Sequence, residues 1–139
     1  MANRLGGFGT AAALVLSVGL FVPRLLPSNP DDWHKKTEFD ADQTLTGGVY
    51  RILPEKAQRL MQFAAIAGQD SATTVLAGSI ESGMVTFVSR SKVFGFPDYT
   101  TVWQDGADLK IHARLRFGYK DFGVNAARVD EWIAQLNAL

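Results

Sequence analysis

Two short loops carry the residue types that could form a binding or catalytic site. Each contains the pattern Phe-Gly-aromatic-x-Asp, at residues 94–98 and again at residues 117–121. An aspartate can accept a proton or a hydrogen bond, a glycine permits a tight turn, and an exposed aromatic ring can contact a ligand or a partner. The two copies are too close in the chain to be repeated domains, so the similarity concerns the loops alone.

The motifs of known catalytic families are mostly absent. The chain has no Gly-x-Ser-x-Gly elbow, no phosphate-binding glycine loop and no His-Glu-x-x-His sequence. Its two histidines, His34 and His112, are not at the spacing of metal ligands, and the lack of cysteine excludes disulfides and thiolate zinc sites. A triad of Ser89 or Ser91 with His112 and Asp98 rests on residue type alone. We therefore expect no catalytic residue, no cofactor and no metal, while an enzymatic role stays open.

Hydrophobic periodicity predicts the elements that position the two loops. Strands are expected at residues 49–52, 73–80, 84–94, 99–104 and 109–117. One helix should begin at Pro54 and end near Gly68, and a second should begin with Asn125 as its N-cap. Short connections make the last four strands an antiparallel meander. The predicted fold class is α+β, an antiparallel sheet of about five strands with two helices packed on one face, preceded by one N-terminal transmembrane helix.

The strand at residues 109–117 has the cleanest alternation in the chain. Its apolar residues should face the helices, while Lys110, His112, Arg114 and Arg116 point to the other side. We expect this basic row to be a solvated outer face of the sheet. The alternative is a surface that attracts phospholipid headgroups.

The meander should bring the two aspartate-bearing loops together. Strand ends alternate between the two ends of a meander, so the loops that follow the first and third of three successive strands lie at the same end. We expect a polar and aromatic patch there that binds a small ligand or a partner. The candidate binding residues are Lys92, Phe96, Asp98, Arg116, Tyr119, Asp121, Asn125 and Arg128. The alternative is a structural junction in which aspartates cap turns and Arg116 pairs with Asp121 or Asp98.

The first part of the chain has the composition of a membrane segment. Residues 5–22 carry no charge, and such a run spans about 27 Å as a helix, close to the ~30 Å hydrocarbon core of a bilayer. The exit through Pro23 lacks the small residues of a cleavage site, so we expect an uncleaved anchor, with a cleaved signal peptide and a buried core helix as alternatives. The expected domains are a transmembrane anchor at 1–26, a linker at 27–44 and an α+β globular domain at 45–139.

Location and partners follow from this segment. A very short tail before a first span is typical of a signal-anchor, so the C-terminal domain is expected in the periplasm, although the flanking charges do not settle the orientation. The expected partners are the lipid bilayer, through residues 5–22, and a protein in a membrane complex. Nucleic acid is not expected, because 14 basic and 14 acidic residues give a net charge of zero. Trp33 lies either at the membrane interface or over the domain's own core.

The most specific sequence in the chain is Arg-x-Gly-Tyr-x-Asp-x-Gly-Val-Asn-x-x-Arg at residues 116–128. Together with residues 89–98, it resembles domain-of-unknown-function family 1499, which occurs in bacterial and some plastid proteins, and the resemblance covers roughly Trp33 to the C-terminus. It implies that the loop pair is the signature of the family, and it implies no established activity.

Three functions fit these observations. The first is a membrane-anchored accessory domain that binds a partner or ligand at the paired loops. The second is a small hydrolase-like enzyme that uses Asp98, Asp121 and Arg116, which requires these side chains to converge at an open cleft. The third is a structural subunit of a membrane complex.

Overall fold

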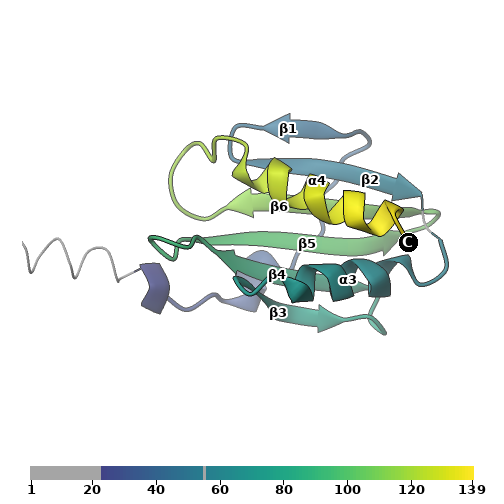
Figure 1. Ribbon diagram of the computed structural model, residues 1–139, viewed down its shortest axis with the longest axis horizontal. Helices are drawn as coiled ribbons and strands as arrows, with labels where there is room; N and C mark the ends of the chain where they lie inside the picture. Colours follow the sequence, from purple (N-terminus) through teal and green to yellow (C-terminus); the bar gives the residue numbers. More distant parts are fainter. Residues whose placement is uncertain (1–22, 55) are drawn as a thin grey trace, which may run out of the picture.

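The fold is described by a computed structural model over residues 23–54 and 56–139 (Figure 1). Its elements are α2 (Pro30–Trp33), β1 (Gln43–Leu45), β2 (Gly48–Pro54), α3 (Arg59–Gln69), β3 (Thr73–Ser79), β4 (Met84–Arg90), β5 (Pro97–Asp105), β6 (Asp108–Leu115) and α4 (Val124–Asn137). The strands form one antiparallel sheet of six in the order β1-β2-β6-β5-β4-β3. The α+β class and the meander of the last four strands are therefore confirmed, with six strands instead of about five.

Both long helices cover one face of the sheet, where the hydrophobic core lies (Figure 1). The core-facing side of β6 carries Leu109, Ile111 and Ala113, all fully buried as the alternation predicts. Trp132 of α4 meets Phe63 of α3 edge to face, with ring centroids 5.8 Å apart. Burial of each large apolar side chain contributes roughly 1.5–3 kcal/mol before entropy is subtracted, so this layer holds the helices on the sheet.

Both predicted helix starts are wrong by a few residues. Pro54 is the last residue of β2, opposite Asp108 of β6, and α3 begins only at Arg59. Gln58, with a φ of 67°, makes the turn between the two elements. At the second helix, α4 begins at Val124 and its N-cap is a glycine, as described below for the loop that precedes it.

The strand that sequence analysis missed is β1, which lies across the predicted boundary between the linker and the globular domain. It has three residues and pairs with the start of β2 through a tight turn at Thr46 and Gly47. Gly48 lies so close to β6 that a Cβ atom there would be 2.2 Å from the Ala113 carbonyl oxygen. Three residues are too few to show an alternating pattern, which is why periodicity does not reveal the strand.

Residues 23–42, here called the strap, cross the second face of the sheet behind the strands in Figure 1. Trp33 stacks on Tyr99 with ring centroids 3.8 Å apart. Farther along, Phe39 stacks on Tyr50 at 4.3 Å. Trp33 thus covers the domain's own sheet, which is one of the two places expected for it.

The strap corrects the expectation of a solvated basic row on β6. His112 is buried, and its Nδ1 is hydrogen-bonded to Thr37 Oγ1 at 2.8 Å. Arg114 is half-buried and donates hydrogen bonds to the Trp33 carbonyl and, at 3.2 Å, to Thr101 Oγ1. Burial lowers the pKa of Arg114 to about 10. The centre of the row therefore binds the strap and is not a free outer face.

The predicted transmembrane segment at residues 5–22 lies outside the described residues. Among the residues that the structure describes, no helix is both long and apolar enough to cross a bilayer.

Candidate functional site

The two loops of the repeated pattern meet at one end of the sheet, as the meander predicts, although Asp98 itself lies at the start of strand β5, after its loop. One follows β4 (residues 91–96) and the other follows β6 (residues 116–123), and together they are called the rim here. The rings of Phe96 and Phe117, one from each loop, lie 6.0 Å apart. The sheet register places Asp98 of β5 opposite Leu115, the last residue of β6. The juxtaposition inferred from the sequence is confirmed.

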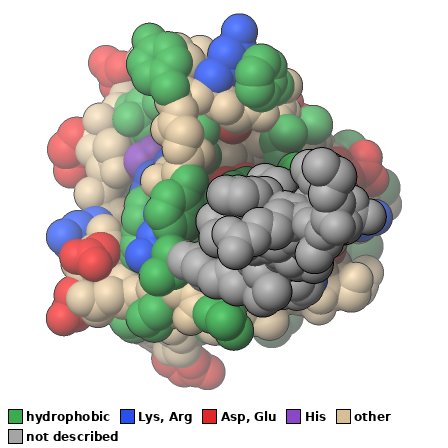
Figure 2. Space-filling model, turned by 90° about the vertical axis from the view of Figure 1, so that its left-hand side faces the viewer, with side chains coloured by type: hydrophobic (Ala, Val, Ile, Leu, Met, Phe, Trp, Pro, Cys, Tyr) green, Lys and Arg blue, Asp and Glu red, His purple; other side chains and the backbone are tan. Residues whose placement is uncertain are grey.

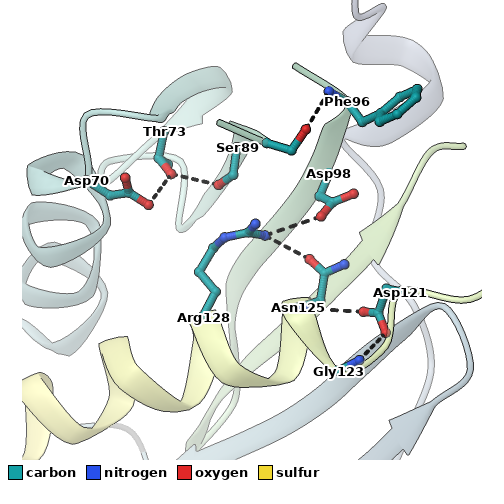
Figure 3. Close-up of polar contacts among 10 residues, drawn as sticks. Asp70, Thr73, Ser89, Phe96, Asp98, Asp121, Gly123, Asn125 and Arg128 are labelled. Atoms are coloured by element: carbon teal, nitrogen blue, oxygen red, sulfur yellow. Dashed lines mark hydrogen bonds and ion pairs between the residues drawn. The ribbon is translucent and has the colours of Figure 1, made fainter. Parts of the chain in front are cut away.

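Asp121 fixes the turn into α4. Its Oδ1 accepts a hydrogen bond from the Gly123 amide at 2.9 Å, and its Oδ2 accepts one from the Asn125 amide at 3.2 Å (Figure 3). Its own amide donates to the Thr46 carbonyl at 3.1 Å, which ties the loop to the β1–β2 turn. Gly123, with a φ of 80°, is the N-cap, so the prediction of Asn125 as N-cap is wrong. The aspartate supplies the acceptors that free helix amides require.

Asn125, Arg128 and Asp98 form a compact polar junction beneath the rim (Figure 3). Asn125 is fully buried, and its Oδ1 accepts a hydrogen bond from Arg128 Nη1 at 3.0 Å. The same Nη1 lies 3.6 Å from Asp98 Oδ2, and both of these side chains are mostly buried. One arginine of α4 thereby links the first turn of its own helix to the start of β5.

The electrostatics of this junction are dominated by burial. Burial raises the pKa of the Asp98 carboxyl above its ordinary value, against the opposing effect of the Arg128 charge. The nearby Asp121 carboxylate raises the Asp98 pKa further. At 3.6 Å the Arg128 ion pair is too long to offset the loss of water around the carboxylate.

Arg116 lies apart from this junction, on the strap side of the sheet. Its Nη1 donates to the Pro27 carbonyl at 2.8 Å and to Tyr99 Oη at 3.2 Å. Asp98 instead pairs with Arg128. The structure therefore does not bring Arg116 together with Asp98 and Asp121, as an enzyme built on these three residues would require.

The remaining predicted residues lie at the surface of the rim. Lys92 is exposed, Phe96 is partly exposed and Tyr119 is 84% exposed. Sequence analysis missed further exposed apolar side chains in the same two loops. These are Val93, Phe94, Phe117 and Phe122. The signal that could have found them is the concentration of large apolar residues in glycine-containing loops, where no core-facing periodicity explains them.

Two arginines that sequence analysis also missed hold the start of the strap against the rim. Arg90 Nη1 donates to the Pro23 carbonyl at 3.0 Å. Arg24 Nη2 donates to the carbonyls of Lys92 at 3.0 Å and Val93 at 2.6 Å. The Arg24 side chain lies over Gly95, where a Cβ atom would be 2.0 Å from Arg24 Cγ. The first described residues of the chain are therefore fixed beside the loop that follows β4.

A groove of about 400 Å³ opens between α3 and α4 beside this junction. It is lined by Ile66, Gln69, Asp70, Arg128, Glu131, Trp132 and Gln135. Only Arg128 of the predicted residues reaches it. Within residues 23–54 and 56–139, histidine and acidic side chains do not gather in threes that could hold a metal ion.

These contacts define what the arrangement can do chemically. Both oxygens of Asp121 are used by backbone amides, and Asp98 and Arg128 are mostly buried against each other. A general acid or base must reach the substrate from an open site, and these carboxylates serve the fold. The polar residues fix the turn into α4 and the start of β5, while the aromatic and lysine side chains form the outer surface of the rim.

No curated protein matches the chain. A family model described as "Protein of unknown function (DUF1499)" matches residues 24–136, which include the strap, the sheet, both long helices and the rim. The chain therefore belongs to the DUF1499 family.

Proposed function

We propose that this protein is a membrane-anchored, extracytoplasmic accessory domain that makes its interactions through the rim. The anchor is the uncharged run at residues 5–22, and the folded domain is its extracytoplasmic part. In this proposal the protein has no catalytic role, and its partner acts at the paired loops.

One observation carries the proposal: exposed aromatic side chains gather on two loops that a buried polar junction holds in place. Tyr119 and Phe122 are 84% and 82% exposed, although large apolar side chains are normally covered in a soluble domain. Asp121 holds the loop that carries them through its bonds to the Gly123 and Asn125 amides and to the Thr46 carbonyl. A rigid loop that presents aromatic rings loses little entropy on binding, which favours an interaction surface.

The alternative of a hydrolase-like enzyme lacks the convergence it needs. Arg116 is bonded to the strap, on the opposite side of the sheet from the Asp98–Arg128 pair. Asp121 is occupied by the first turn of α4. The accessory role requires only the surface of the rim.

The anchor is tested by alkaline extraction of membranes that contain the full chain, which must leave the protein in the membrane. The side of the membrane is tested with Glu81→Cys, because the natural chain contains no cysteine and Glu81 is exposed in the β3–β4 turn. A membrane-impermeant maleimide added from outside must label this variant. Labelling only after the membrane is permeabilised would refute the extracytoplasmic location.

The role of the rim is tested by cross-linking in native membranes with Tyr119→Ala and Phe122→Ala. Met61→Ala on α3 is the control, because Met61 is also an exposed apolar residue, at 45%. The cross-linked neighbours are read out as both protein and lipid, and the two rim variants must change them while the control does not. Unchanged neighbours in folded, membrane-bound rim variants would refute the rim as the interaction surface.

A further inference from the structure

We infer that the partner of the rim is the lipid bilayer itself, and that the rim lies in the boundary between headgroups and acyl chains. This inference rests on the proposed function, since it requires the anchor at residues 5–22 to be in the membrane. It assigns the partner at the paired loops to lipid and gives the domain a fixed orientation, with its strands directed toward the membrane.

The first argument is the tether between the uncharged run and the rim. The run ends at residue 22, and the next residue, Pro23, accepts a hydrogen bond from Arg90 at the end of β4. Arg24 then donates to the Lys92 and Val93 carbonyls within the rim. No spacer separates the predicted membrane segment from the rim, so a run that spans the bilayer places the rim at the bilayer surface.

The second argument is the chemistry of the exposed side chains at this end. All of the exposed large aromatic residues in the described part of the chain lie in the rim. They are Phe94 at 43%, Phe96 at 39%, Phe117 at 39%, Tyr119 at 84% and Phe122 at 82% exposure. Figure 2 looks at this end and shows hydrophobic side chains with Lys and Arg among them, and Asp and Glu side chains toward the edges of the view. Aromatic rings on a polar scaffold are typical of the membrane interface.

The third argument is charge. The charged residues of the rim are Lys92, Arg116, Lys120 and Asp121. Lys92 and Lys120 are exposed, and Lys120 lies over the ring of Phe122 at 5.2 Å, whereas Asp121 is half-buried and accepts hydrogen bonds from the Gly123 and Asn125 amides. The solvent-facing charges of the two loops are therefore cationic, which suits phosphate groups and anionic lipids.

The opposite end of the sheet has different chemistry. The hairpin between β5 and β6 is flanked by Asp105, which pairs with Lys110 at 2.8 Å, and by Asp108, and the turn between β3 and β4 contains the exposed Glu81. Exposed acids of this kind are repelled by an anionic membrane surface. The chain thus has an aromatic and cationic end beside the anchor and a more acidic end away from it, an asymmetry that a soluble partner would not require.

A depth measurement on the full chain tests the inference. Tyr119→Cys in the rim and Leu139→Cys at the C-terminus are matched positions, because the two side chains are 84% and 80% exposed. The loop between β6 and α4 and the C-terminus lie at opposite ends of the sheet (Figure 1). Each variant is labelled with an environment-sensitive fluorophore and placed in lipid nanodiscs of phosphatidylcholine with phosphatidylglycerol. Lipids that carry a nitroxide near the headgroup are then added as quenchers.

The label at position 119 is expected to emit at shorter wavelength and to be quenched at least threefold more strongly than the label at position 139. Equal quenching at both positions in nanodisc-bound protein would overturn the inference and leave the anchored domain of the proposed function intact. A blue-shifted emission of the label at position 119 in native membranes but not in nanodiscs would also overturn it, in favour of a protein partner. Protein that does not enter nanodiscs at all, and that alkaline extraction also releases from native membranes, would overturn both proposals.

Discussion

Acidification should destabilise the protein through His112, because the strap shields this side chain from water. His112 is only 8% exposed and is bonded to Thr37. Burial, assisted by the Arg114 charge, lowers its pKa to about 3, whereas a histidine in an unfolded chain has a pKa of about 6.5. The unfolded state therefore binds the proton first. Stability that is present above the unfolded pKa is lost as the pH falls toward the folded pKa.

The size of the loss follows from the two pKa values. Between pH 7 and pH 5 the folded histidine stays neutral while the unfolded one becomes almost fully protonated, which removes about 2 kcal/mol of unfolding free energy. This figure is insensitive to the folded pKa as long as that pKa stays well below 5. The unfolding free energy of a small domain is typically about 5–15 kcal/mol, so this loss is a substantial fraction of it.

Urea unfolding at pH 7, 6 and 5 measures the effect. The wild type should lose about 2 kcal/mol more over this range than His112→Gln, which cannot take up the proton. Identical pH dependence in the wild type and in His112→Gln would refute the burial of His112 under the strap. An NMR titration of wild-type His112 gives the same answer if the variant does not fold, since a pKa near 6.5 would contradict the reasoning.

Three further predictions concern the junction and the sheet. Asp121→Ala should cost about 1 kcal/mol in thermal unfolding because the amides of Gly123 and Asn125 at the start of α4 lose their acceptor. Tyr119→Ala should stay within about 0.5 kcal/mol, and equal effects of the two variants would contradict the role of Asp121 at this turn. Gly48→Ala should cost more than about 1 kcal/mol in urea unfolding, because its Cβ would meet the Ala113 carbonyl at 2.2 Å, and a neutral result would contradict this packing. Asp98 has a raised pKa, so its carboxyl binds the proton more tightly in the folded state than in the unfolded state. The unfolding free energy therefore falls as the pH rises through that pKa. Asp98→Asn should remove this part of the pH dependence, and an unchanged dependence of the unfolding free energy on pH would contradict the prediction.

Sequence reasoning predicts the framework well where a pattern is long. The alternation in β6 assigns its buried face, and the meander places the loops of Asp98 and Asp121 at one end before any coordinates are considered. Both conclusions depend only on the period of a strand and on the antiparallel order of short connections. These are properties that a single sequence expresses directly.

Sequence reasoning fails where the outcome depends on contacts between distant segments. Arg116 was expected near Asp98 or Asp121, but it bonds to the Pro27 carbonyl, because the strap returns over the face that it occupies. Asn125 has a good N-cap residue type, yet α4 begins one residue earlier, at Val124. Asp121 accepts a hydrogen bond from the Asn125 amide, and the buried Asn125 side chain accepts one from Arg128. Nothing in a run of prolines and charged residues reveals that it packs on a sheet.

The most direct test of the account is the position of the rim relative to the lipid headgroups. Amide signals of the isotope-labelled full chain in nanodiscs are recorded with and without lipids that carry gadolinium at the headgroup. The account predicts that signals from residues 91–96 and 116–123 lose intensity, while those from the turns at residues 80–83 and 105–108 keep theirs. Loss at the two turns with an unaffected rim, or no difference between the two ends, would contradict it.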